Sequence, residues 1–447
     1  MTTEKKILHH SHESTRDFLF SKTDTERLKE VKSHATIDAD QAVKSAHPDV
    51  LSGSDFIDQA LEQLERAAQF SALVIRLDQL IEKSGPNHPA GDHQGAVDAA
   101  GILNELCRLE GGLWGILENG LFGSFFPDRN GSAGLELARN FQHQLKEQTG
   151  HTVTIGIAAF PTITYPKSEI INNARKALDH ATFFGADSSA AFDDVSLNIS
   201  GDNFYEEGQI AEAIHEFKLA LKLDPRNVNV HNSLGVCYGL QNRYDEAIAE
   251  FEKAIALEPE EYMALYNLGL IHLLIEQKDR ALELFLAADK INGDNYEVAF
   301  QTGKLYLEKG HIEKSRTYLE RAAELKPTSG QAYRYLGDCY AAGHKLQAAI
   351  AAYKKAIKHN PQDAAAMSAL GKIFDDQGEN PEIARMFLRE SIALSPENGL
   401  FHHRLGRHFS HQQRLDDALK EFVRAKSLGY DATEDIKAIK ARKKVEK

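Results

Sequence analysis

Residues 235–254 have the sequence GVCYGLQNRYDEAIAEFEKA, and its pattern recurs along the C-terminal half of the chain. The stretch contains Gly235, Ala247, Phe251 and Ala254 at fixed distances from one another. Small residues let two antiparallel helices approach closely, and an aromatic ring fills the space between them. The spacing therefore predicts two packed helices joined by a short turn.

Glycine returns to the same phase throughout this half of the chain. It recurs in steps of 34 residues, with a last step of 35, at Gly201, Gly235, Gly269, Gly303, Gly337, Gly371 and Gly406. The one extra residue falls near Gly378 and Pro381, in the expected turn between two helices, so the packing positions Ala384, Leu388 and Ser391 stay in phase. We therefore expect an all-α solenoid of helical hairpins.

A 34-residue period with these positions resembles the tetratricopeptide repeat (TPR) family. The resemblance covers residues 195–430 as seven repeats, and residues 431–447 are expected to form a C-terminal capping helix or tail. It implies that the first helices of the repeats line a concave groove that binds a protein or peptide partner.

The groove positions can be counted from each repeat glycine. In the third and fourth repeats they predict an apolar stretch containing Tyr266, Leu270, Leu273 and Phe300. For Leu273, packing between adjacent helices is an equal alternative. In the fifth to seventh repeats they predict a mixed-charge stretch containing Arg334, Lys372, His403 and Arg407. Such a groove would suit a peptide with an apolar anchor and a charged flank.

Composition excludes several classes of partner. The 447 residues carry a formal net charge of -14, which disfavours nucleic acid and anionic membranes. Cys107, Cys237 and Cys339 have no metal-binding spacing and indicate buried thiols in a reducing compartment. No apolar run is long enough to span a bilayer, and the N-terminal residues are polar rather than typical of a secretory segment. These features predict a cytoplasmic protein.

The N-terminal part differs from the repeats. Residues 1–46 are expected to be a polar segment, partly helical at most, and residues 47–194 to be an α+β domain. Hydrophobic periodicity predicts helices at 56–68, 94–109, 134–148 and 167–184 and strands at 71–77 and 153–160. Two further strands, 113–117 and 122–126, would form a hairpin with Asn119 and Gly120 at its tip.

Several stretches of this domain resemble, in order, the GGDEF domain of bacterial diguanylate cyclases, which shares the fold of class III nucleotide cyclases. The matching stretches are Asp49-Val50-Leu51-Ser52-Gly53, Gly91-Asp92, Ile155-Gly156-Ile157-Ala158 and Ala174-Arg175-Lys176-Ala177-Leu178. Counting back from Pro127, the family's Gly-Gly-Asp-Glu-Phe signature is replaced by Glu118-Asn119-Gly120-Leu121-Phe122.

The resemblance implies that the carboxylates for metal binding are missing. Arg76 stands at the position of the metal-binding aspartate, and Leu121 replaces the signature glutamate. Condensing GTP requires divalent cations held by carboxylate oxygens, and an arginine opposes such binding. Asp92 matches a residue that contacts the guanine edge, but it serves equally well as a helix cap. A rearranged metal site of Asp78 and Glu118 is the alternative.

The leading hypothesis is a non-enzymatic bacterial scaffold or signalling adaptor. It would combine an inactive GGDEF-like domain with a peptide-binding TPR groove, and it would need no cofactor or metal. The alternatives are an active or atypical diguanylate cyclase, or a nucleotide sensor, regulated by the repeats. In a sensor, Asp78 and Asp92 would be the candidate nucleotide-binding residues.

Overall fold

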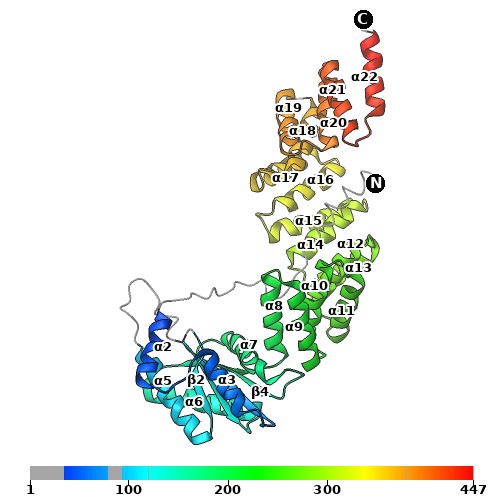
Figure 1. The fold of residues 1–447 in the computed structure, drawn as a ribbon. Helices are drawn as coiled ribbons and strands as arrows, with labels where there is room; N and C mark the ends of the chain where they lie inside the picture. The colour runs from blue at the N-terminus through cyan, green and yellow to red at the C-terminus, as the bar shows by residue number, and fades with distance from the viewer. Residues whose placement is uncertain (1–34, 79–92, 119, 379, 446–447) are drawn as a thin grey trace. The chain divides into compact units, whose positions relative to one another are not determined.

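The computed structural model describes residues 35–78, 93–118, 120–378 and 380–445. The chain divides after Glu258 into two compact units, which we call the first and second units and describe separately. The first unit contains an α+β domain followed by two helical hairpins. The second unit begins at Pro259 and is all α-helical in its described residues (Figure 1).

The α+β domain is built on a five-stranded sheet with the order β2-β3-β1-β4-β5 among its described residues. Neighbouring strands are antiparallel except for β4 and β5, which are parallel. The strands are β1 (Phe70–Leu77), β2 (Leu113–Ile116), β3 (Leu121–Pro127), β4 (Val153–Phe160) and β5 (Ser189–Ala191). The predicted hairpin and both predicted central strands are confirmed, whereas the short β5 was not predicted.

Helices cover both faces of this sheet. They are α2 (Ala35–Ala46), α3 (Gly53–Gln63), α5 (Gln94–Glu110), α6 (Gly131–Thr149) and α7 (Ile170–Thr182), the last preceded by a short 3₁₀ turn, η1 (Lys167–Glu169). Leu73 and Ile75 of β1 pack in the core formed with α2, α5 and α6. Ala72 and Val74 pack in the opposite core with α3 and α7. The strand therefore buries both of its faces, which explains its continuous apolar sequence.

Polar contacts join the α+β domain to the hairpin that follows it within the first unit. Asp193 caps α8 through the backbone N–H of Ser196, and its carboxylate lies 3.3 Å from Nδ1 of His180 on α7. Lys176, also on α7, donates to both carboxylate oxygens of Glu216 on α9, at 2.9 and 2.7 Å. Asp193, which caps the first repeat helix, α8, therefore connects the α+β domain directly to the repeats.

The described hairpins follow the period that the sequence predicts. In the first unit they are α8 (Asp194–Glu206) with α9 (Ile210–Leu223) and α10 (Val228–Leu240) with α11 (Tyr244–Leu257). In the second unit the first three are α12 (Tyr262–Leu274) with α13 (Lys278–Ile291), α14 (Tyr296–Glu308) with α15 (Ile312–Leu325), and α16 (Gly330–Ala342) with α17 (Leu346–His359). The last two are α18 (Ala364–Gln377) with α19 (Pro381–Leu394) and α20 (Gly399–His411) with α21 (Leu415–Ser427).

Each repeat glycine faces the large apolar residue of its own hairpin. A Cβ atom at Gly269 would lie 2.6 Å from the Phe285 ring, and one at Gly303 would lie 2.7 Å from Leu319. The same relationship holds for Gly201, Gly235, Gly337, Gly371 and Gly406, facing Phe217, Phe251, Tyr353, Leu388 and Phe422. Glycine is therefore required because the second helix packs directly on the backbone of the first.

The extra residue of the sixth repeat lies where the sequence places it. Helix α18 ends at Gln377, Gly378 takes the left-handed conformation, and α19 starts with Pro381. The packing residues Ala384, Leu388 and Ser391 remain fully buried. An insertion in this turn therefore leaves the helix contacts intact.

A final helix, α22 (Thr433–Val445), packs against the last hairpin. Ala432 and Ile439 are buried with Phe422 and Ala425 of α21, which agrees with the predicted capping helix. Within the described part of the chain, no helix combines the length and apolar character needed to cross a bilayer.

Candidate functional site

The strand positions that resemble a nucleotide cyclase site hold no metal-binding pair. Arg76 of β1 lies directly across from Leu121 of β3 in the antiparallel register. The Arg76 guanidinium donates a 2.9 Å hydrogen bond to Oγ1 of Thr182 on α7. In the family that this domain resembles, these two neighbouring positions would carry metal ligands. Here they carry the cationic Arg76 and the apolar Leu121.

The other acidic residues here have separate partners. Asp78 accepts from Oγ1 of Thr154 at 2.6 Å and from the backbone N–H of Asp187 at 2.9 Å. Glu118 forms a 2.5 Å ion pair with Arg175 on α7. Each carboxylate therefore has a separate partner, and no group of three His, Cys, Asp or Glu side chains in the described residues could hold a metal. These contacts do not favour a rearranged Asp78 and Glu118 site, which stays an alternative prediction.

Residues 79–92, which include Gly91 and Asp92, and Asn119 lie outside the described residues. Of the remaining signature positions, Gly120 has a positive φ of 74° in the hairpin turn. Leu121 and Phe122 begin β3, and Phe122 is buried against the sheet core. The signature segment therefore serves as an ordinary strand connection here.

The apolar groove candidates of the second unit are mostly buried. Tyr266, Leu270 and Phe300 are 1%, 0% and 2% exposed, and only Leu273 is half-buried. The Tyr266 ring lies 5.6 Å from Phe285, and the pKa of Tyr266 is raised well above its usual value because burial disfavours the phenolate. The prediction of an open apolar stretch is therefore wrong, because these side chains pack rather than present a surface.

The charged candidates are more accessible, but they have intramolecular partners. Arg334 on α16 stacks over the Tyr335 ring and lies 3.8 Å from Asp338 and 3.4 Å from Asp363. Burial acts to lower the pKa of Arg334, but Tyr335 and the two carboxylates raise it above its usual value. The Arg334 charge is therefore stabilised by Asp338 on the same helix and by Asp363, the residue that caps α18.

The remaining candidates lie on α18 and α20. Lys372 pairs with Asp376 at 2.6 Å, and Arg407 lies 3.7 Å from the same carboxylate group. His403 instead packs on Tyr430 and faces Asp435 of α22 at 3.1 Å. Lys372 and Arg407 therefore share one surface, whereas His403 stabilises the C-terminal end.

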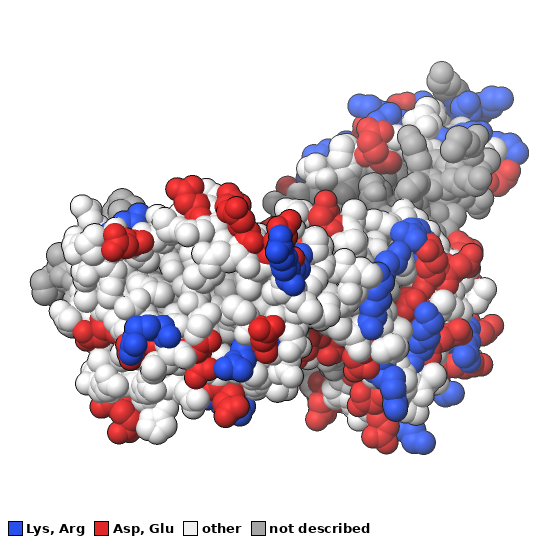
Figure 2. Space-filling view, turned by 60° about the horizontal axis from the view of Figure 1, so that its bottom comes forward, with Lys and Arg blue, Asp and Glu red and all other residues white. Residues whose placement is uncertain are grey.

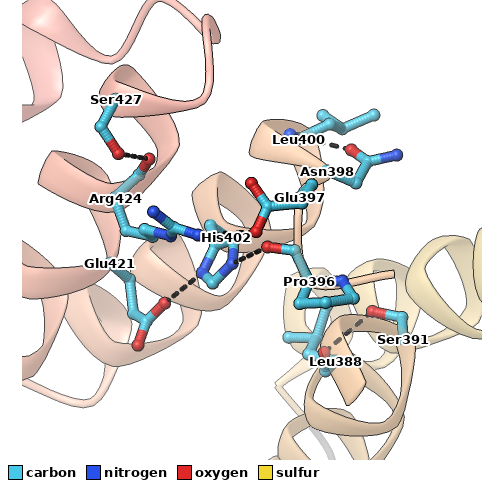
Figure 3. Close-up of polar contacts among 10 residues, drawn as sticks. All are labelled: Leu388, Ser391, Pro396, Glu397, Asn398, Leu400, His402, Glu421, Arg424 and Ser427. Carbon is cyan, nitrogen blue, oxygen red and sulfur yellow. Dashed lines mark hydrogen bonds and ion pairs between the residues drawn. The ribbon is translucent and has the colours of Figure 1, made fainter. Parts of the chain in front are cut away.

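A histidine of the seventh repeat joins its two helices. Figure 3 shows His402 of α20 between Glu421 and Pro396: Nδ1 donates to the Glu421 carboxylate at 2.7 Å, and Nε2 donates to the Pro396 carbonyl at 3.0 Å. His231, Glu250 and Pro225 of the second repeat make the same contacts, at 2.6 and 3.0 Å.

The same glutamate position has a different partner in the first repeat. Glu216 corresponds to Glu250 and Glu421, but Leu197 stands where those repeats have histidine. The Glu216 carboxylate accepts instead from Lys176 of the α+β domain. In the first repeat, the glutamate at this position therefore contacts the α+β domain instead of a histidine of its own hairpin.

Two residues in the last repeats, His408 and Arg404, were not predicted from the sequence. Asp375 bridges His408 and His411, which donate to its two oxygens at 2.8 and 2.9 Å. Arg404 donates to Oγ of Ser368 on α18 at 3.0 Å. Arg404 lies two residues before Gly406, where the other repeats have a neutral residue, and that contrast is the signal that could have identified it.

The face seen in Figure 2 has no large patch of purely basic or purely acidic side chains. Basic and acidic side chains lie next to each other over much of that face. Interspersed charges favour specific polar contacts rather than general attraction to a polyanion.

Comparison with family models identifies tetratricopeptide repeats. Models described as "TPR repeat" and "Tetratricopeptide repeat" match residues 201–242 and residues 240–296, 300–364 and 342–382. No curated protein sequence matched the chain.

Several solved structures are similar to part of the chain. One, YrrB, described as a TPR protein with an unusual peptide-binding site, is 24% identical, with a TM-score of 0.35 over 40% of this chain and 91% of that one. MamA is 26% identical, with a TM-score of 0.34 over 38% and 93%. PilF of Pseudomonas aeruginosa is 18% identical, with a TM-score of 0.42 over 45% and 92%. The family models alone identify the residues they match between 201 and 382 as tetratricopeptide repeats, a repeat type that supports a role in protein–protein interaction.

Proposed function

We propose that this chain is a non-enzymatic scaffold or signalling adaptor that binds a protein partner through its repeats. The observation that carries the proposal is the series of TPR hairpins, each closed by a glycine packed against a large apolar side chain. Repeats of this kind present extended concave surfaces rather than catalytic pockets. The partner would be a peptide segment lying along the first helices.

The accessible part of this surface lies on the fifth to seventh repeats. Lys372 and Arg407 are 43% and 42% exposed, and both point their charge toward Asp376. A partner could place its own carboxylate or amide groups against Lys372 and Arg407 in place of Asp376. Breaking the existing ion pairs would cost little free energy, because exposed ion pairs contribute little stability. The anchors we expect here are therefore polar rather than apolar.

The α+β domain would be a GGDEF-like domain retained for its shape. Its sheet order and central hairpin support the resemblance, but the resemblance remains a proposal. The pairing of Arg76 with Leu121 and the ion pair of Glu118 with Arg175 support loss of metal-dependent chemistry. The domain would then act by recognition or by supporting the first hairpin.

Capture from an extract of the native host tests this function. The full-length chain would be immobilised beside a Lys372→Ala and Arg407→Ala double variant, with Lys253→Ala on α11 as a matched exposed control. We expect at least one protein to be retained by the wild type and the control but lost from the double variant, as measured by mass spectrometry. Equal retention by all three chains, with loss only when residues 47–190 are removed, would move the binding site to the α+β domain.

A further inference from the structure

Arg404 of α20 is a partly buried cation without a carboxylate partner among the described residues. Its side chain donates to Oγ of Ser368 on α18 at 3.0 Å. No carboxylate oxygen of the described chain lies within ion-pair distance of it, although Asp338 and Asp376 are close enough to affect its charge. A guanidinium has five N–H donors in a fixed fork, so most of its donor capacity is available.

The acidic groups around Arg404 are already engaged. Asp338 accepts from the Tyr353 hydroxyl at 2.6 Å and faces Arg334 at 3.8 Å. Asp376 pairs with Lys372 and Arg407. Asp375 is held between His408 and His411. Each of these carboxylates therefore has other partners, and Arg404 forms no ion pair with any of them within the described residues.

Partial burial of the Arg404 charge has an energetic cost. Burial lowers the pKa of Arg404 below its usual value, because removing water disfavours the charged form, although Tyr353 and Asp338 partly oppose that effect. A guanidinium remains charged at neutral pH even so. An added carboxylate would recover the lost solvation through paired N–H donors, and such charge-assisted bonds are among the strongest in proteins.

We propose that Arg404, together with Ser368, binds one carboxylate side chain of a peptide that lies along α16, α18 and α20. This inference rests on the proposed function and defines the chemistry of its partner. Asp338 on α16 and Tyr430, which follows α21, both lie close enough to affect the charge of Arg404. In this proposal the bound group is the side chain of an aspartate or glutamate, and the amidated peptides of the test below exclude a C-terminal carboxylate.

The same surroundings restrict the partner further. Asp338 and Asp376 would repel a second carboxylate close to the first. The preferred peptide therefore has a single acidic residue flanked by neutral or basic residues, and a polyacidic segment binds less well. This selectivity separates the proposed site from a general anion-binding surface.

A random 12-residue peptide library displayed on phage, selected on the full-length chain, tests the proposal. The enriched consensus would be synthesised with a fluorescent label and an amidated C-terminus, in an acidic form and in a form with Gln or Asn in place of the acid. Affinities would be measured by fluorescence anisotropy for the wild type, Arg404→Gln, Arg404→Lys and the control Arg424→Gln, which removes an exposed arginine of the same repeat paired with Glu397.

We expect Arg404→Gln to weaken binding of the acidic peptide by about tenfold or more, as loss of a charged hydrogen-bonded pair implies. Binding of the neutral peptide should change little, Arg404→Lys should lie between, and Arg424→Gln should match the wild type. Circular dichroism would check that each variant is folded. Enriched peptides without an acidic residue, or equal losses for both peptide forms, would overturn the assignment of Arg404 while leaving peptide binding intact. Failure to enrich any peptide would contradict both this inference and the proposed function.

Discussion

Arg76 and Leu121 are direct cross-strand neighbours in the central pair of the sheet. A metal-dependent cyclase of the resembling family would need carboxylates at these two positions. We therefore expect no cyclic dinucleotide when the purified chain is incubated with GTP and Mg²⁺ or Mn²⁺, as measured by liquid chromatography and mass spectrometry. Product that disappears in Asp78→Ala or Glu118→Ala would contradict this expectation and revive a rearranged site.

The repeat glycines should be intolerant of any side chain. Gly269→Ala places a methyl group 2.6 Å from the Phe285 ring, so we expect it to cost about 1–3 kcal/mol of unfolding free energy by overpacking, and Gly269→Leu to cost more. Gly293→Ala is the matched control, because the nearest atom to its added Cβ is 3.6 Å away. Thermal unfolding that is equally affected by both substitutions would show that the helix contact is misplaced.

Tyr266 should act as a core residue. Its ring is buried and lies beside Phe285, so Tyr266→Ala should lower the unfolding free energy by roughly 3–5 kcal/mol through loss of packing. Tyr266→Phe keeps the ring and should cost much less. Urea unfolding followed by circular dichroism measures both; a stable Tyr266→Ala variant that loses only partner binding would return Tyr266 to the groove.

Asp375 should make the last repeats sensitive to acid. Burial acts to raise its pKa, but the hydrogen bond from His408 and the charge of His411 bring the pKa below its usual value. A carboxyl group with a lowered folded-state pKa stabilises the fold above its unfolded pKa, near 3.9, and this stability is lost as the pH falls through the folded value.

Comparison of Asp375→Asn with the wild type isolates this effect. The difference in urea midpoint should be large at pH 6 and should shrink as the pH falls below about 3.9, because the carboxyl group of the unfolded chain then takes up a proton before that of the folded chain. Asp416→Asn, at a side chain that is 88% exposed, should show little difference at either pH. A difference for Asp375→Asn that is independent of pH would exclude the linkage.

The sequence predicted the hairpins well because their determinants are local and periodic. Gly269, Ala281 and Phe285 specify a close helix contact by size alone, and the same spacing returns in each repeat. The strands at 71–77 and 153–160 were also predictable because both of their faces are apolar. Strand β5 could not be predicted, since three residues, Ser189–Ala191, carry no periodic signal and pair only because β4 lies beside them.

The candidate site was harder to predict, because groove positions are defined relative to neighbouring helices. Counting from the glycine selected Lys372 and Arg407, whose side chains are exposed, but it could not show that Leu270 and Phe300 are buried. It also did not identify Arg404, which forms a hydrogen bond to Ser368 and no ion pair with a carboxylate among the described residues. Ion pairing between repeats is a property of three-dimensional packing that spacing alone does not reveal.

The central claim is that the partner is held by the repeats, and chemical cross-linking of the captured complex, read by mass spectrometry, tests it most directly. Lys304 on α14 and Lys372 on α18 lie on first helices of the repeats, whereas Lys44 and Lys146 lie on the α+β domain. The account predicts that partner cross-links concentrate on Lys304 and Lys372 and are lost when unlabelled consensus peptide is added. Cross-links confined to Lys44 and Lys146 and unaffected by the peptide would contradict it.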